Sequence, residues 1–161
     1  MRLKFVAIGL WVAFFTAYCC QAQDPCASGG RTDCPEAVRF LAKMQSAVKT
    51  NKPEVVAALV QFPLRATIEN RARMIPKRDF DRYFTEIFTP TVRCAIEQAK
   101  SADLFYNWQG YMIARGTVWW DKKGHGKNTD WSSVPFKIIT VNNDIDPSIA
   151  KELCPSVKTR R

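Results

Sequence analysis

The sequence predicts an α+β fold in which N-terminal helices pack on a curved antiparallel sheet and disulfides staple the domain. In the first half of the chain, apolar residues recur at helical spacing in 35–51 and 77–99. In the second half, residues 104–120 and 135–142 alternate as strands do. An even number of cysteines lies beyond residue 22, which is typical of a disulfide framework.

The first expected feature is a signal peptide over residues 1–22. It has a short basic start, an uncharged apolar run over 5–17 and small residues before a cleavage site after Ala22. The apolar run is shorter than the roughly 20 residues that span a bilayer. We therefore expect cleavage, a periplasmic location and a secreted single domain over 23–161.

Lipidation at Cys19 or Cys20 is the alternative for this leader, and it would tether the protein to a membrane. A lipidation motif needs small residues just before the cysteine, and Tyr18 departs from that pattern. We expect contact with a membrane only if this lipidation occurs.

The formal net charge of +9 falls to +7 when Arg2 and Lys4 leave with the leader. This balance favours an anionic partner, although a role in solubility alone explains it equally well. Because export separates the chain from nucleic acid, the expected partner is another exported protein that is acidic, with a small ligand as the other option.

The four remaining cysteines are Cys26, Cys34, Cys94 and Cys154, and sequence alone allows three pairings of them. We favour Cys26 with Cys34, which closes a small loop, and Cys94 with Cys154, which ties the C-terminal segment to an internal helix. The spacings are not those of a zinc site and the only histidine, His125, is far away in sequence. We expect no metal and no cofactor.

The helices are predicted from proline at their first turn and from apolar residues at a 3.6-residue period. Pro35 and Pro53 start the first two, and Thr89-Pro90 separates the two central ones. Pro63 argues that the strand containing it is an edge strand or begins there. The expected ranges are helices at 35–51, 53–60, 77–88 and 90–99, a hairpin at 62–75, and a last helix at 146–153.

Two strands around an Arg115-Gly116 turn form the most strongly predicted hairpin. In that register Tyr111 opposes Trp120, Met112 opposes Trp119, and Ile113 opposes Val118. Trp119 and Trp120 then lie on opposite faces, so only one of them belongs to the core. A polar loop over 121–134 leads to a final strand at 135–142, expected to pair with the hairpin.

The segment 104–120, with 62–65 upstream and 136–143 downstream, resembles small exported bacterial proteins of the nuclear transport factor 2-like (cystatin-like cone) superfamily. The resemblance covers residues 35–143 and implies a cone in which a curved sheet wraps a helix. The superfamily contains enzymes, ligand carriers and binding modules. Its enzymes place acids or histidines inside the cone, and the sheet positions assigned here carry none.

These observations predict a non-catalytic periplasmic binding protein, an inhibitor or immunity protein for an exported toxin or hydrolase. The alternative is a carrier of a small apolar ligand, a lipid or a cell-wall fragment, inside the cone. An enzyme ranks third, and it would need a carboxylate or His125 in that cavity. The aromatic residues also suit a hydrophobic core, and the lysine-rich loop also suits a solvated turn. The expected contact residues are Trp108, Tyr111, Trp119, Trp120, Lys122, Lys123, His125 and Lys127. No catalytic residue is assigned.

Overall fold

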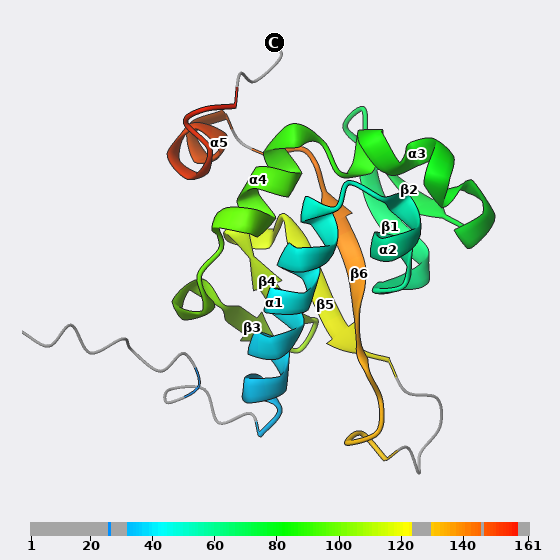
Figure 1. The fold of residues 1–161 in the computed structure, drawn as a ribbon, viewed down its shortest axis with the longest axis vertical. Coiled ribbons are helices and arrows are strands. Elements are labelled where there is room, and N and C mark those ends of the chain that lie inside the picture. Colours follow the sequence, from blue (N-terminus) through cyan, green and yellow to red (C-terminus); the bar gives the residue numbers. More distant parts are fainter. Residues whose placement is uncertain (1–25, 27–31, 124–129, 146, 158–161) are drawn as a thin grey trace, which may run out of the picture.

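The structure is a computed structural model that describes residue 26 and the ranges 32–123, 130–145 and 147–157. Within this part of the chain the fold is α+β, as the sequence predicts (Figure 1). The expected signal peptide and the two loop residues His125 and Lys127 lie outside the described residues.

Proline occupies one of the first two positions in four of the five described helices, where its missing N–H breaks no helical hydrogen bond. The hydroxyl of Thr89 accepts from the N–H of Val92 at 3.3 Å and so caps the fourth helix. The helices are α1 (Cys34–Lys49), α2 (Pro53–Ala57), α3 (Phe80–Ile87), α4 (Pro90–Gln98) and α5 (Pro147–Leu153).

Six strands form one sheet in the order β2-β1-β6-β5-β4-β3. The sheet is mixed, because β1 and β6 run parallel while every other neighbouring pair is antiparallel. This corrects the predicted antiparallel sheet. A parallel pair needs a long crossover, and the chain between these two strands supplies it. The strands are β1 (Val60–Ile68), β2 (Arg71–Ile75), β3 (Phe105–Asn107), β4 (Gly110–Ile113), β5 (Val118–Lys122) and β6 (Phe136–Asn142).

Pro63 lies inside β1, which is an interior strand rather than an edge. The pairing of β1 with β6 skips from Val60 to Arg65, and its pairing with β2 begins at Leu64. Pro63 therefore falls in a gap in both ladders, and its missing N–H leaves no backbone partner unpaired. The expectation of an edge strand was wrong because it took no account of this irregularity.

The predicted hairpin register is confirmed residue by residue: Tyr111 pairs with Trp120, Met112 with Trp119, and Ile113 with Val118. Pairing of β5 with β6 is confirmed as well. However, β5 continues to Lys122, so residues 121 and 122 belong to the strand and not to the predicted polar loop.

Helix α1 crosses β4, β5 and β6 and covers one face of the sheet (Figure 1). The Phe40 ring lies 6.2 Å from that of Trp120 and 5.9 Å from that of Phe136, measured between centroids. The side chain of Trp120 is 0% exposed, as are those of Ile138 and Val141. The space between helix and sheet is therefore filled with side chains of the chain itself.

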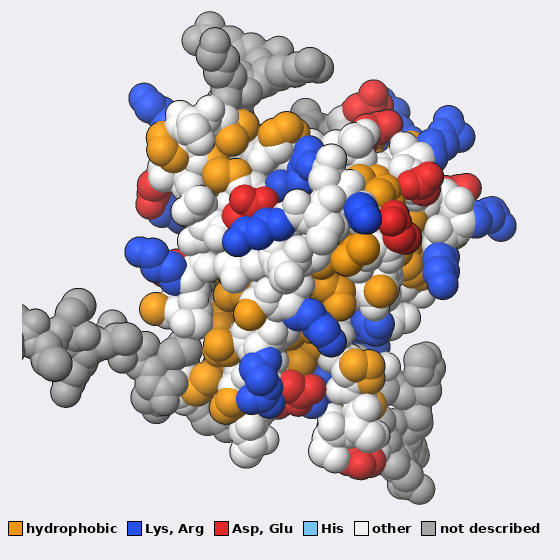
Figure 2. All heavy atoms as spheres, viewed as in Figure 1, with side chains coloured by type: hydrophobic (Ala, Val, Ile, Leu, Met, Phe, Trp, Pro, Cys, Tyr) orange, Lys and Arg blue, Asp and Glu red, His pale blue; other side chains and the backbone are white. Residues whose placement is uncertain are grey.

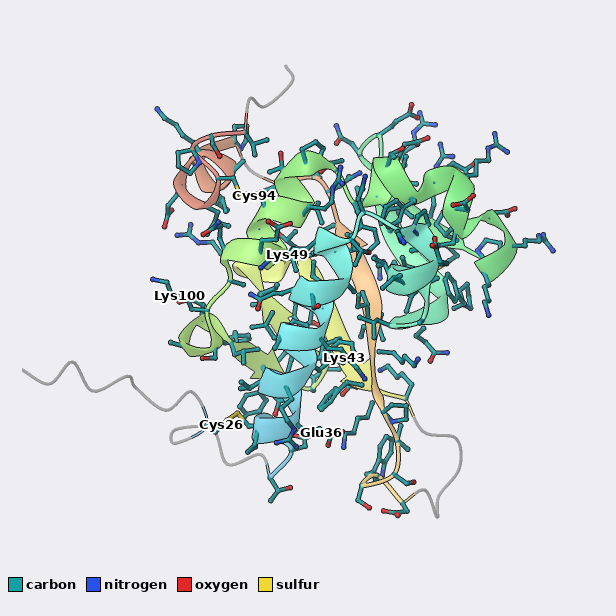
Figure 3. The ribbon with its side chains drawn as sticks, in the orientation of Figure 1. Cys26, Glu36, Lys43, Lys49, Cys94 and Lys100 are labelled. Atoms are coloured by element: carbon teal, nitrogen blue, oxygen red, sulfur yellow. A yellow bond between two sulfur atoms is a disulfide. The ribbon has the colours of Figure 1, made fainter. Side chains whose placement is uncertain are left out.

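Both predicted disulfides are present. The first joins Cys26 to Cys34 at the start of α1, and the second joins Cys94 in α4 to Cys154 just after α5 (Figure 3). The second bond holds α5, which contacts α4 more than any other described element.

Candidate interaction surface

On the face of the sheet opposite α1, strand pairing aligns one residue from each of the six strands. Each member is the direct cross-strand partner of the next, so the six side chains form a continuous band across the sheet. We name this band the outer row. Its members, in order from β3 to β2, are Phe105, Met112, Trp119, Thr140, Arg65 and Met74.

Burial of the flanking residues shows which way the outer row faces. Arg65 is exposed and stands between Leu64 and Ala66, both of which are fully buried. Since successive residues of a strand point to opposite faces, the row lies on the side away from the helix-covered core. At its two ends Phe105 is 51% and Met74 is 60% exposed, so no described helix covers them.

The indole of Trp119 is fixed in the middle of the outer row. Its Nε1 donates to the carbonyl of Gly116 at 3.0 Å. A Cβ at position 116 would lie 3.3 Å from that Nε1 and 3.7 Å from the sulfur of Met112, and Gly116 has a φ of +92°. The glycine thus leaves room for the ring beside Met112. A ring that is already ordered loses little conformational entropy when a partner packs on it.

The turn between β3 and β4 lies at the apolar end of the sheet. The side-chain oxygen of Asn107 accepts from the N–H of Gln109 at 2.8 Å, which holds the turn. Trp108 stands at the tip and is 88% exposed. Together with Phe105 it presents two uncovered aromatic side chains at the edge of the sheet, and exposed aromatic residues are enriched at protein interfaces.

The β1–β2 end of the face carries a cation. Arg65 is exposed, and none of the ion pairs between described residues includes it. Arg71 pairs with the buried Ile68 and therefore lies on the other face. The one carboxylate that strand alternation places on the described part of this face is Asp121, and it lies 3.3 Å from Lys123. On the helix-covered side, by contrast, cations and carboxylates are interspersed (Figure 2). The outer face therefore has an apolar end at β3 and β4 and carries the cation Arg65 near its other end.

A second feature is a hollow of about 470 Å³ between the start of α1 and the turn around Trp131. The ammonium of Lys122 lies at its inner side, 2.5 Å from the carboxylate of Glu36 and 3.0 Å from the carbonyl of Trp131. The hydroxyl of Tyr111 donates to the carboxylate of Asp33 at 2.8 Å. These contacts fasten the first turn of α1, where Glu36 is labelled in Figure 3, to β4 and β5.

The turn at the rim of this hollow is ordered by Asp130. The hydroxyl of Ser132 donates to its carboxylate at 2.6 Å and the N–H of Ser132 donates at 3.0 Å. These bonds hold the pKa of the Asp130 carboxyl below its ordinary value. The ionised carboxylate keeps the turn in the shape that presents the carbonyl of Trp131 to Lys122.

Glu36→Gln is expected to lower the free energy of unfolding by about 1–3 kcal/mol, because it leaves the ammonium of Lys122 buried without its counter-charge. Only 6% of the Lys122 side chain is exposed. Lys122→Met removes the buried charge itself and should cost less than Glu36→Gln. Urea unfolding of the two variants measures both values, and an equal or smaller loss for Glu36→Gln would show that the ion pair does not stabilise the fold.

The structure separates the predicted contact residues into three groups. Trp108 and Lys123 are exposed and Trp119 is partly exposed, each on or beside the outer face. Tyr111, Trp120 and Lys122 are buried on the α1 side, so we remove them from the candidate surface. His125 and Lys127 lie outside the described residues.

Sequence reasoning missed five members of the outer row as contact residues. The two-residue period that placed Trp119 on the outer face was an available signal. It also places Lys122 on the same side as the core residues Val118 and Trp120. Extending that period to the first hairpin would have placed Arg65 on the outer face. The missed members are Phe105, Met112, Thr140, Arg65 and Met74.

Within the described ranges, no group of three or more His, Cys, Asp and Glu side chains is placed to hold a metal ion. No helix in that part of the chain combines the length and apolar character needed to cross a membrane. Comparison of the chain with models of known families, with curated proteins and with solved structures found no match.

Proposed function

We propose that this chain is a non-catalytic exported protein that binds another exported protein through its outer row, as the inhibitor or immunity protein of a toxin or hydrolase. The observation that carries the proposal is the outer row itself. It is a continuous band across all six strands, in which Phe105, Arg65 and Met74 are exposed and the three members between Phe105 and Arg65 are partly exposed. An uncovered band rich in Met, Phe, Trp and Arg has the composition of a protein interface.

The dimensions of the band favour a protein over a small ligand. Neighbouring strands lie about 4.8 Å apart, so the five steps from Phe105 to Met74 span roughly 24 Å. That width suits one side of a standard interface of about 800 Å² per partner. The inner side offers little for the carrier alternative, because Phe40 and Trp120 occupy the space between α1 and the sheet.

The outer row also supports a binding role over an enzymatic one. Its polar members are Arg65 and Thr140, and the row holds no carboxylate or imidazole that could transfer a proton at neutral pH. A surface of this kind recognises a partner by contact and blocks it by covering it.

We further propose that the fold is the nuclear transport factor 2-like cone and that the protein works in the periplasm. The cone is supported by the element order and by two irregularities, in the β1–β6 and β5–β6 pairings, where strands can bend. Export is supported by the two disulfides, which form and persist in oxidising compartments. The predicted leader over residues 1–22 adds to the same proposal.

Photo-crosslinking in the native cells tests the binding role. A photoreactive phenylalanine analogue at position 108 should yield a defined adduct with one exported protein. The matched control carries the analogue at Lys43, an exposed residue on α1 and thus on the helix-covered side (Figure 3). We expect the position 43 variant to give no such adduct.

The inhibitory role makes two further predictions. The captured protein should be a toxin or hydrolase, encoded beside this chain, and purified protein should suppress its activity at equal molar ratio. Equal crosslinking from positions 43 and 108 would contradict recognition by the outer row. A partner whose activity is unchanged in the complex would contradict inhibition while leaving binding intact.

A further inference from the structure

We infer that the partner sets a carboxylate against Arg65 and an apolar side chain against Trp119 and Met112, so that it presents an acidic and apolar segment to the outer row. The inference rests on the proposed function and adds the chemistry of the partner. It assigns a specificity role to Arg65, which lies in β1.

Arg65 occupies a position that any partner covering the row must also cover. It pairs with Thr140 on one side and with Met74 on the other, two strands away from Trp119. No ion pair between described residues holds its guanidinium. In the free protein this charge is therefore satisfied by solvent.

Covering the row removes that solvent. A buried charge without a counter-charge is strongly unfavourable, so a partner that packs on Trp119 and Met74 must also supply an acceptor to Arg65. The hydroxyl of Thr140 alone cannot neutralise a guanidinium. A carboxylate can, because its two oxygens match the planar fork of arginine in a bidentate pair.

A second copy that packs outer face against outer face does not provide that carboxylate. The one carboxylate that alternation places on the described outer face is Asp121, and Lys123 already neutralises it. Two mature chains, each with the net charge of +7 that remains after loss of the leader, also repel each other. Charge complementarity therefore points to a different, acidic protein.

The sheet also sets the spacing of the two contacts. Arg65 and Trp119 lie on β1 and β5, with β6 between them. Two strand steps of about 4.8 Å place them roughly 10 Å apart. The partner segment must hold its carboxylate and its apolar side chain at that separation.

A library of random peptides displayed on phage, panned against the full mature protein, tests this chemistry. Wild type should enrich peptides that combine Asp or Glu with aromatic or aliphatic residues. Arg65→Glu should reverse the preference toward Lys and Arg, whereas the matched Arg39→Glu variant, changed at an exposed position on α1, should keep the wild-type preference. A synthetic acidic peptide from the selection should bind Arg65→Glu on the order of tenfold more weakly than wild type.

The outcomes separate the two proposals. If Trp119→Ala abolishes enrichment but Arg65→Glu leaves the acidic preference unchanged, the outer row binds partners and the inferred chemistry is wrong. If neither substitution changes the selection, or no peptide is enriched, both the surface and its chemistry are contradicted. Thermal unfolding of every variant, with Arg65→Ala included, checks that the substitutions leave the fold intact.

Discussion

Trp120→Ala is expected to lower the free energy of unfolding by about 3–5 kcal/mol, whereas Trp119→Ala should cost about 1 kcal/mol. Trp120 is fully buried, and its ring lies near those of Phe40 and Tyr111. Trp119 is partly exposed on the other face, donates to the carbonyl of Gly116 and pairs with Met112 across the hairpin. Urea unfolding of the two single variants gives the comparison directly.

This pair is its own control, because the two residues are identical and adjacent in the chain. The expected difference comes only from the face of the sheet on which each side chain lies. Similar losses for both variants would mean that the outer face is covered in solution. A larger loss for Trp119→Ala would mean that the hairpin register is shifted by one residue.

Loss of the Cys94–Cys154 bridge is expected to cost about 4 kcal/mol, and loss of the Cys26–Cys34 bridge about 2.5 kcal/mol. The difference follows from loop closure in the unfolded chain, since the two bridges join residues 60 and 8 positions apart. The larger bridge also ties α5 to α4. Each pair is replaced by alanine, and the free energy of unfolding is measured in urea.

The two double variants control for each other, because both remove two thiols and one bond. If the Cys26–Cys34 variant were the less stable of the two, local packing around the start of α1 would outweigh loop length. A free thiol at Cys94 in the non-reduced mature protein would contradict the larger bridge altogether.

The sequence predicted local features of this fold because their causes are local. Alternation of side chains placed Trp119 and Trp120 on opposite faces, and proline at a first turn marked the start of α1 and α4. The parallel β1–β6 pairing has no such signal. It depends on where the helices and strands between the two carry the chain, and that is a property of packing rather than of any short segment.

The candidate surface was predicted in part for the same reason. Exposed Trp108 and partly exposed Trp119 follow from hairpin position and strand period. The role of Lys122 could not be predicted in this way, because its ion pair with Glu36 joins two residues that are distant in sequence. Strand period alone could have placed Arg65 on the outer face, but only the strand order, with β1 beside β6, brings its side chain into one band with Trp119.

The most direct test of the account is the dissociation constant of the protein captured from position 108, measured against wild type and an Arg65→Ala, Trp119→Ala double variant. If the outer row is the interface, the double variant should bind on the order of a hundredfold more weakly, because both a charge contact and an aromatic contact are lost. Lys43→Ala on the opposite side should bind as wild type does. Equal affinity of the double variant and wild type would contradict the claim that the outer row recognises the partner.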